Sequence, residues 1–591
     1  MVTDDNNVVK QLSAIQHKFG YVPQKELYEL SKRIGVPVYE LHGVATFFPH
    51  YRMTPPPRAS FQVCMDISCH MKRAPQLKAR LEELAAAGGT GDIEVKGCSC
   101  LGQCDGAPAM LINDHPYARR GDAGLVELCQ LAIGGREVPH EHFEGVKGPF
   151  KTDPYADEGE RYGALKAVVA SGDYEGVIAK IKDANLKGMG GAGFPTHIKW
   201  NTVRNRQAPQ KYIVCNADES EVGTFKDREL MKNMPYLLVE AMTIAALVTG
   251  ATKGYIYSRH EYHEQIEILE KEIARAKFLG ILGDNVLGSG KAFHLEVFVS
   301  PGGYVQGEET ALIEAIEGKR GQPRNKPFDV GLEKGGPAFT GVFGMPTVVN
   351  NVETFSYVPV ILVKGPDAFK GFGINGCQGL KWVGVSGDVN NPGVFEVPMG
   401  TTYEDVIYGL AGGISGGRKM YAFAPSGPSF GLLPASMANL KLDWNTSVDV
   451  VGRILGSGAV VAVAEGRDVL DLALNFTRFY RNESCGKCVP CRVGSQKLVD
   501  LIVGIMQGSA GADDLHAVGP LAKTLDMTSI CGLGQVVSKP IQSVMRFFPE
   551  VIDKALKGGS KAALAASGAG GAGRGGAGRG GLVGVTVNGK A

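Results

Sequence analysis

The sequence lacks the features that would place it in a membrane, on a nucleic acid or outside the cell. Its longest apolar stretch, residues 235–255, is interrupted by Glu240 and is too short to span a bilayer, so we expect a buried helix there. A net charge of +1 gives no general attraction for nucleic acid. The first residues, MVTDDNNVVK, are polar and acidic, which argues against a signal peptide. We therefore predict a cytoplasmic protein with no membrane span and no nucleic-acid partner.

Cysteine is also scarce, yet four of the 12 cysteines form two close pairs in the first 110 residues: Cys64, Cys69, Cys100 and Cys104. Reduced thiols grouped in this way in the cytoplasm indicate metal binding or chemistry. Two such loops suit a cluster of two irons. Zinc fits this spacing less well because its sites favour two intervening residues, and free core cysteines are the third reading. By spacing alone, Cys98 could replace Cys100.

A second group is tighter. Cys485, Cys488 and Cys491 are each separated by two residues, which suits three corners of a cubane cluster, and Cys531 in TSICGLGQ is the candidate fourth ligand. We predict a [4Fe–4S] cluster, and the reducing compartment disfavours a disulfide knot. The isolated cysteines are predicted to be buried apolar residues: Cys129, Cys215 and Cys377.

A chain of 591 residues is too long for one hydrophobic core, so a multidomain α/β protein is expected. Hydrophobic periodicity and breaks at Gly and Pro give the boundaries. The predicted parts are a helical bundle (1–57), a compact α/β domain (58–145), a larger α/β domain (155–375), a β-grasp-like domain (376–455), a helical domain (456–557) and a Gly-rich tail (558–591). The two RGG repeats of the tail leave RNA binding as a minor hypothesis.

One loop in the larger α/β domain is rich in glycine. Gly188, Gly190 and Gly193 match the dinucleotide fingerprint, but residues 173–188 before them have a helical pattern instead of the required strand. The fold is therefore predicted to be a non-classical, Rossmann-like one. Glycines expose backbone N–H groups to a phosphate or an aromatic ring, and Lys199 can add charge. A flexible interhelical loop is the alternative.

Three further polar segments lie in the same domain. They are VCNADESEVGTFKDR (214–228), the segment around Glu308 and Glu309, and PTVVNNVET (346–354). Together with the glycine loop they predict a cleft for a large, anionic, partly aromatic ligand.

These stretches, over residues 155–555, resemble the flavin-bearing, 51 kDa type of NADH dehydrogenase subunit of respiratory complex I. The N-terminal motif CLGQCDGAPAM resembles that of the partner 24 kDa subunit, which has a helical bundle followed by a thioredoxin-like [2Fe–2S] domain. This resemblance implies Cys100 and Cys104 as ligands and leaves Cys98 spare. It also implies an SLBB-type β-grasp domain and a fusion like that of diaphorase subunits in NAD-linked hydrogenases and formate dehydrogenases.

The resemblance implies the cofactors FMN, NAD(H), one [4Fe–4S] and one [2Fe–2S], and the residues that bind them. For FMN these are Gly188, Gly190, Gly191, Ala192, Gly193, Lys199, Asn216, Asp218, Glu219, Tyr304, Gly307, Glu308, Asn350, Asn351 and Thr354. For NADH they are Phe194 and Phe328 stacking on adenine, Glu221 at the nicotinamide, and Glu309 with Lys326 at the adenosine ribose. Glu221 and Glu308 are the candidate catalytic residues, with an orienting role. A carboxylate near the ribose 2′-hydroxyl favours NAD over NADP.

The sequence departs from the family at three positions. Met189 stands where the family usually has arginine, Thr202 replaces a second aromatic, and Phe328 is shifted by one residue. We predict an NADH:acceptor oxidoreductase module in a hetero-oligomer, with a ferredoxin-like electron-transfer subunit and a catalytic subunit of unknown type as partners. The departures motivate the alternative of an iron–sulfur relay subunit with impaired NADH turnover.

Overall fold

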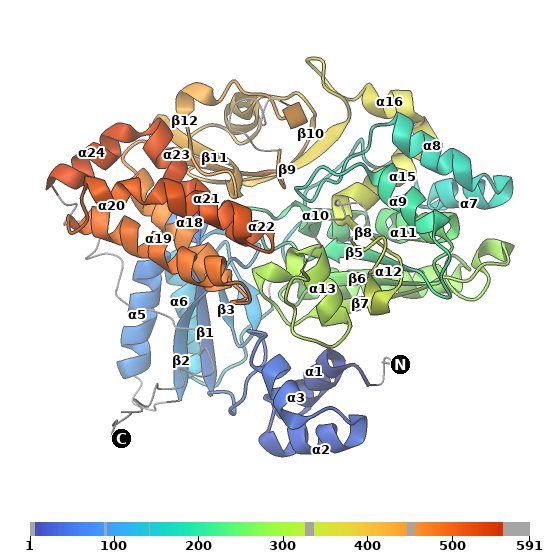
Figure 1. Cartoon of the computed structure of the whole chain (residues 1–591), viewed down its shortest axis with the longest axis horizontal. Coiled ribbons are helices and arrows are strands. Elements are labelled where there is room, and N and C mark those ends of the chain that lie inside the picture. The colour runs from blue at the N-terminus through green and yellow to red at the C-terminus, as the bar shows by residue number, and fades with distance from the viewer. Residues whose placement is uncertain (1–5, 88–91, 141, 326–335, 446–454, 559–591) are drawn as a thin grey trace, which may run out of the picture.

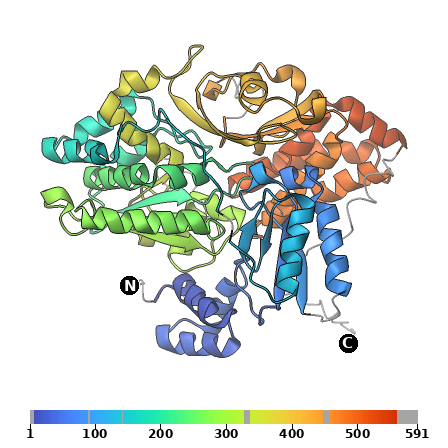
Figure 2. The same cartoon turned by 180° about the vertical axis from the view of Figure 1, so that it is seen from behind.

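The computed structural model describes residues 6–87, 92–140, 142–325, 336–445 and 455–558. These residues form three sheets with helices at both ends of the chain (Figure 1). In Figure 1 and Figure 2 the five-stranded sheet lies at the top. The C-terminal helices lie below one side of it and the parallel sheet of the central domain below the other. The multidomain α/β architecture predicted from the sequence is confirmed.

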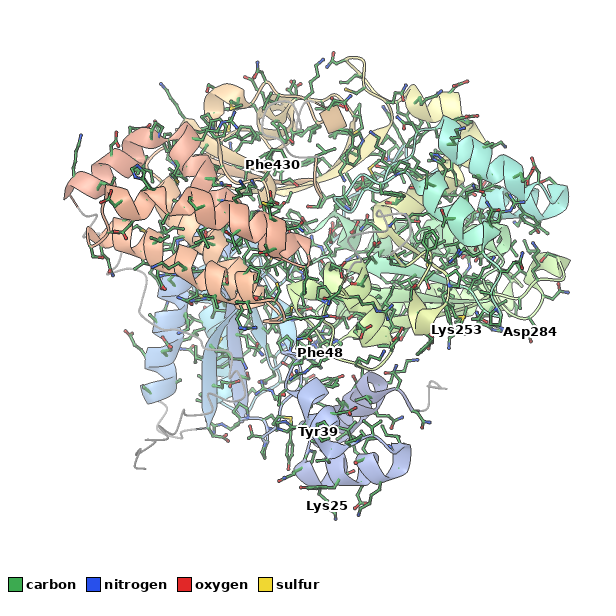
Figure 3. The ribbon with its side chains drawn as sticks, viewed as in Figure 1. Lys25, Tyr39, Phe48, Lys253, Asp284 and Phe430 are labelled. Carbon is green, nitrogen blue, oxygen red and sulfur yellow. The ribbon has the colours of Figure 1, made fainter. Side chains whose placement is uncertain are left out.

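The N-terminal helical bundle packs on the central part of the chain. It contains α1 (Val8–Phe19), α2 (Gln24–Ile34) and α3 (Val38–Ala45). The Asn7 side chain caps α1 by accepting a hydrogen bond from the Lys10 N–H at 3.0 Å. Leu12 shares a hydrophobic cluster with Phe298 of strand β7 (His294–Ser300). Phe48, labelled in Figure 3 where this bundle meets the central domain, is 2 % exposed and belongs to the same cluster.

The N-terminal α/β domain follows. Its sheet has the order β2-β1-β3-β4, in which β1 and β2 are parallel and β3 is antiparallel to β1. The elements are β1 (Ala59–Cys64), α4 (Ile67–Met71), α5 (Ala74–Ala87), β2 (Ile93–Cys98), β3 (Met110–Ile112), β4 (His115–Tyr117) and α6 (Gly121–Ile133). Cys64 ends β1, Cys69 lies in α4, and Cys100 and Cys104 follow β2, so the first cysteine group gathers at one sheet edge because parallel strands end on the same side.

The central α/β domain is built on a fully parallel sheet of order β7-β6-β5-β8. The chain runs outward from β5 through β6 to β7 and returns to β8 on the other side of β5. The carboxyl ends of β5 and β8 therefore meet at a topological switch point, where open α/β sheets bind ligands. The elements are α7 (Gly163–Ser171), α8 (Tyr174–Asp183), α9 (Thr196–Asn205), β5 (Tyr212–Ala217), α10 (Lys226–Asn233), α11 (Pro235–Thr249), β6 (Lys253–Arg259), α12 (His263–Phe278), β7, α13 (Glu309–Ile316), β8 (Thr347–Asn351), α15 (Val352–Lys364) and α16 (Pro366–Lys370).

Helix α11 contains the longest apolar run of the sequence and is buried, as predicted. Glu240 in its middle is 0 % exposed, and its carboxylate accepts hydrogen bonds from the Tyr155 hydroxyl at 2.8 Å and the Leu165 N–H at 3.0 Å. The segment between the two predicted α/β domains (58–145 and 155–375) is in part buried. Thr152 is 0 % exposed because it bonds Glu396 and the indole of Trp382.

The five-stranded sheet has the order β10-β9-β13-β11-β12. Its strands are β9 (Leu380–Gly387), β10 (Gly393–Pro398), β11 (Met420–Pro428), β12 (Leu433–Pro434) and β13 (Ala459–Ala464). Strand β13 lies between β9 and β11, pairing parallel with the former and antiparallel with the latter. The domain boundary predicted between residues 455 and 456 cuts this sheet, so it belongs after Ala464.

The C-terminal helical domain extends over the N-terminal α/β domain. It contains α18 (Val469–Glu483), α19 (Val489–Gln507), α20 (Ala512–His516), α21 (Val518–Thr528), α22 (Gly532–Val536), α23 (Lys539–Phe547) and α24 (Pro549–Gly558). The Asp468 side chain caps α18 by accepting from the Leu470 N–H at 2.9 Å.

Within the described part of the chain, none of the helices combines the length and the apolar character that crossing a bilayer requires. The predicted site residues Lys326 and Phe328 lie outside the described residues, as does the tail from residue 559 onward.

Candidate functional site

The glycine loop connects helix α8 to helix α9, so it does not follow a strand as a dinucleotide fingerprint would. It closes on itself, since the Gly188 N–H donates to the Phe194 carbonyl at 2.9 Å and the Gly193 N–H donates to the Gly188 carbonyl at 3.2 Å. A Cβ atom on Gly190 would lie 3.0 Å from Cβ of Asn351. Glycine at this position is therefore what lets the loop approach the end of β8.

The carboxyl ends of β5 and β8 meet this loop, as the sequence predicted. The Thr354 hydroxyl, in the first turn of α15, accepts a hydrogen bond from the Met189 N–H at 2.8 Å. The Asn216 amide donates to the Gly307 carbonyl at 2.9 Å, and the Asn350 side chain accepts from the indole of Trp200 at 3.0 Å. The glycine loop, both strand ends and the Tyr304–Gly307 turn thus surround one switch point.

Asp218 lies just after β5 and is 7 % exposed. Neither of its carboxylate oxygens has a hydrogen-bond partner of normal geometry among the described residues. Burial raises the pKa of Asp218 to about 8, although Arg259 opposes this shift. A buried carboxyl group with so little hydrogen bonding inside the protein could bond a polar ligand at the switch point.

The Glu219 carboxylate is hydrogen-bonded within the protein. It accepts from the Asp227 N–H at 2.8 Å and the Arg228 N–H at 3.1 Å, at the start of α10, and from the Tyr262 hydroxyl at 3.0 Å. Burial raises the pKa of Glu219 to about 7. These hydrogen bonds place the carboxylate at the N-terminus of α10, and a contact between Glu219 and flavin stays a prediction.

A buried charge cluster behind the glycine loop was not predicted from the sequence. Glu353 is 0 % exposed and lies 2.9 Å from the Lys226 ammonium and 2.5 Å from that of Lys381. Lys381, on β9, also lies 3.5 Å from the Met189 carbonyl. Burial lowers the pKa of Lys381 to about 8. A cation from another domain therefore reaches the loop position where the family usually has arginine.

The two candidate catalytic glutamates occupy different environments. The Tyr304 hydroxyl donates to the Glu221 carboxylate, whose other oxygen accepts from the Ser429 N–H at 3.3 Å. Burial raises the pKa of Glu221. Glu308 instead caps α13, accepting from the Thr310 and Ala311 N–H groups at 2.9 Å each. Glu221 is therefore held between Tyr304 and Ser429, whereas Glu308 caps a helix.

Three residues predicted to bind two different ligands, Lys199 for FMN and Phe194 and Glu309 for NADH, lie close together. Lys199 forms an ion pair with Glu309 at 3.0 Å, and the same ammonium donates to the Val349 carbonyl at 3.1 Å. It also lies 5.8 Å from the centre of the Phe194 ring. Glu309, which was predicted to bind the adenosine ribose of NADH, is therefore paired with Lys199, which was predicted to bind FMN.

The first cysteine group is assembled in the N-terminal α/β domain. Cys64, Cys69, Cys100 and Cys104 are each at most 5 % exposed. The sulfur atoms of Cys100 and Cys104 are 3.4 Å apart. Cys98 does not join them, because its thiol donates to the Gln62 carbonyl at 3.5 Å.

Two arginines of the central domain hold the Cys100–Cys104 loop. Arg228 donates to the Gly102 carbonyl at 2.6 Å and pairs with Asp105 at 2.9 Å. Arg259 donates to the carbonyl of Cys100 and to that of Glu219, both at 2.7 Å. The cysteine loop and the segment after β5 thus share one guanidinium, which joins the two candidate sites.

The second cysteine group lines one small hollow: Cys485, Cys488, Cys491 and Cys531. The Lys487 ammonium donates to the Pro323 carbonyl at 2.6 Å, and this contact ties the cysteine loop to the central domain. Cys488 directly precedes α19, so it lies at the N-terminal end of a 19-residue helix. Val305, beside Tyr304, lines the same hollow.

The donor chemistry fits the implied cofactors. Four thiols in each group are the ligands that iron–sulfur clusters use. The close approach of the loop at Gly190 to Asn351 and the buried carboxyl oxygens of Asp218 fit a polar, ring-bearing ligand such as FMN. Among the residues described, no three His, Cys, Asp or Glu side chains are arranged around a single metal ion. Of the isolated cysteines, Cys129 and Cys215 are buried as predicted, whereas Cys377 is only partly buried.

Comparison with known families divides the chain as follows. Residues 2–130 match the thioredoxin-like [2Fe-2S] ferredoxin, 181–360 the Nuo51 FMN-binding domain, 382–433 the SLBB domain and 471–555 the NADH-ubiquinone oxidoreductase-F iron-sulfur binding region.

Among curated proteins, the NADP-reducing hydrogenase subunit HndC of Solidesulfovibrio fructosivorans is 40 % identical over 63 % of this chain and 74 % of its own length. The NADH-quinone oxidoreductase F subunit of Aquifex aeolicus is 40 % identical over 68 % and 90 %, respectively. The corresponding F 2 subunit of Rhizobium meliloti is 37 % identical over 66 % and 91 %. A chain of the NAD+-reducing [NiFe]-hydrogenase in the H2-reduced state superimposes with a TM-score of 0.82 and 31 % identity, over 93 % of this chain and 94 % of the other.

Proposed function

The chain belongs to the family of NADH-quinone oxidoreductase F subunits, with a thioredoxin-like [2Fe-2S] domain fused ahead of it, and we propose how its residues divide the work. The protein is an NADH oxidoreductase module of a multisubunit complex that uses FMN, one [2Fe–2S] and one [4Fe–4S] cluster. When bound, these cofactors supply the hydride and single-electron chemistry, and the protein supplies binding, orientation and electrostatics.

In this proposal the glycine loop and the β8 end bind FMN. Backbone N–H groups of the loop face the phosphate, and the ammonium of Lys381, which Glu353 holds, lies behind the loop. Asp218, with its raised pKa of about 8, is protonated at pH 7 and can donate a hydrogen bond into the cleft. Tyr304 orients Glu221 at the nicotinamide end.

The NADH adenosine is proposed to bind at Phe194 and Glu309, close to Lys199. The first cysteine group is proposed to hold the [2Fe–2S] cluster and the second the [4Fe–4S] cluster. This proposal rests on the contacts that join the three candidate sites. Arg259 bonds both the Cys100 loop and the segment after β5, and Val305 lines the hollow of the second cysteine group.

The departures at Met189 and Thr202 motivate a second candidate, a relay subunit with impaired NADH turnover. The 3.5 Å approach of Lys381 to the Met189 carbonyl supports the first function, since the loop keeps a nearby cation. Anaerobic addition of NADH to the holoprotein distinguishes them. We expect the flavin absorbance to bleach within the mixing time of a manual assay. Flavin that stays oxidised, while dithionite still reduces it, would favour the relay.

We propose that the partner subunit carries an iron–sulfur cluster and docks beside the second cysteine group. Val489 and Val493 lie one helical turn apart on α19 and are 59 % and 58 % exposed, and Met527 of α21 is 65 % exposed. Large exposed apolar side chains next to a redox group suit a protein interface. The cytoplasmic location stays a prediction.

A further inference from the structure

Helix α18 packs against the N-terminal α/β domain and contacts it through polar side chains. Asp471 pairs with His70 at 2.6 Å, and Asn475, one turn later, donates to the Met65 carbonyl at 2.8 Å. His70 and Met65 flank the segment that carries Cys69. The helix is therefore fixed against the first cysteine group before it ends at Glu483.

Glu483 contacts both other redox loops with one carboxylate and is 2 % exposed. One oxygen accepts from the Ser99 hydroxyl at 2.5 Å, and Ser99 directly precedes Cys100. The other accepts from the Tyr304 N–H at 2.8 Å, in the turn next to Glu221. Glu483 itself stands two residues before Cys485, so a single side chain joins three loops that carry candidate redox ligands.

Resting on the proposed function, we propose that Glu483 is a positioning residue that also sets the reduction potential of the [2Fe–2S] cluster. As a carboxylate it accepts both hydrogen bonds at once, which fixes the Ser99 and Tyr304 loops relative to each other. Its buried negative charge next to the cluster loop disfavours the addition of an electron there. On the same loop the guanidinium of Arg259 contacts the Cys100 carbonyl at 2.7 Å and acts in the opposite direction.

Two variants separate charge from contact. Glu483→Gln removes the charge but keeps the shape, because its amide oxygen can accept from the Tyr304 N–H and its amide N–H can donate to the Ser99 oxygen. We expect the [2Fe–2S] midpoint potential to rise, with the reduced-to-oxidised ratio at a fixed potential increasing about tenfold, or about 59 mV. Ser99→Ala keeps the charge and removes a hydrogen bond that partly compensates it, so the potential is expected to fall.

The measurement is an EPR-monitored redox titration of the purified holoprotein with dithionite, which does not depend on NADH. Glu240→Gln is the matched control, because Glu240 is equally buried but its carboxylate bonds Tyr155 and Leu165. It should leave the [2Fe–2S] potential unchanged.

Opposite shifts in Glu483→Gln and Ser99→Ala support the proposal. Shifts of the same sign indicate a purely structural contact and overturn it, as does an unchanged potential in Glu483→Gln. If the Glu483→Gln protein lacks either cluster, the Ser99→Ala variant decides alone. A lower [2Fe–2S] midpoint potential in that variant supports the proposal, and an unchanged or higher potential overturns it. Absence of a [2Fe–2S] signal in the unmodified protein contradicts the proposed function instead.

Discussion

The ammonium of Lys381 lies 3.5 Å from the carbonyl oxygen of Met189, although the two residues belong to different domains. Lys381 is 0 % exposed and is held by Glu353 at 2.5 Å. The five-stranded sheet thus contributes a buried cation to the back of the glycine loop. The charge that this loop lacks at position 189 is supplied from a strand distant in the sequence.

Lys381→Met is expected to weaken FMN binding about tenfold, because it removes a buried cation close to the proposed phosphate site. Titration of flavin-free protein with FMN, followed by quenching of flavin fluorescence, measures this. Lys370→Met, which removes a lysine from a surface pair with Asp367, is the control and should bind FMN normally. Equal affinities for the two variants would show that Lys381 has only a structural role.

Cys100→Ser and Cys98→Ser are expected to differ, although the two residues are close in the sequence. Cys100 lies 3.4 Å from Cys104, sulfur to sulfur, whereas the Cys98 thiol donates to the Gln62 carbonyl. EPR of the dithionite-reduced protein should lose the [2Fe–2S] signal in Cys100→Ser and keep it in Cys98→Ser. The reverse pattern would mean that Cys98 is the ligand.

Asp218 should make the flavin-free protein less stable as the pH rises. Its pKa of about 8 in the folded state exceeds the ordinary 3.8, so between these values the folded protein holds a proton that the unfolded chain has lost. The contribution is full below about pH 4 and is lost towards about pH 8, at up to about 1.4 kcal/mol per pH unit.

The variant Asp218→Asn cannot ionise, so its melting temperature should fall less between about pH 5 and pH 8 than that of the unmodified protein. Thermal unfolding of flavin-free samples measures this. The exposed Asp553→Asn is the control and should follow the unmodified protein. Identical pH profiles for all three proteins would contradict a protonated Asp218.

Glu309→Gln is expected to raise the use of NADPH relative to NADH by about tenfold, because a carboxylate near the adenosine ribose repels a 2′-phosphate and Lys199 remains to attract it. The ratio of kcat/KM values for the two nucleotides, with ferricyanide as acceptor, measures the change. Glu270→Gln, at an exposed position of α12, is the control. A ratio unaffected by Glu309→Gln would place the ribose elsewhere.

Val493→Asp with Met527→Asp should impair electron transfer to the partner subunit and leave NADH oxidation by ferricyanide intact. Both side chains are more than half exposed, so the substitutions cost little stability, but charge disfavours an apolar interface. Co-purification with the complex and turnover with its natural acceptor give the readout. Tyr39→Asp, at another exposed position on the N-terminal bundle, should leave both unchanged.

The local features of the site could be predicted from the sequence. The spacing of the cysteines identified both groups, and the polar residues after the strands identified segments that meet at the switch point of the parallel sheet. Spacing alone left Cys98 and Cys100 open, because the choice depends on which thiol points to a neighbouring carbonyl. The orientation of Glu219 was missed for a similar reason, since its carboxylate pairs with N–H groups a few residues later.

Non-local pairing explains the remaining differences. Strand β13 joins β9 in parallel, and a parallel partner far along the chain leaves no local sequence signal. Lys226, Lys381 and Glu353 are ordinary surface residue types by composition, and they are buried only because they meet one another. Thr152, between the two predicted α/β domains, has no local sign of burial because its partner, Glu396, lies on a distant strand.

The N-terminal bundle packs on the central domain through Leu12 and Phe298, so both ends of the N-terminal α/β domain are tied to the rest of the chain. The first cysteine group, in residues 1–145, therefore associates intramolecularly with the rest of the chain. Its effective concentration is one that dilution cannot lower. An assay at picomolar protein should behave as one at micromolar protein does. A two-chain version cut near residue 145 would lose its first cysteine group on dilution, at a rate set by the contacts between the two parts, among them those of Arg228, Arg259, Asp471 and Glu483.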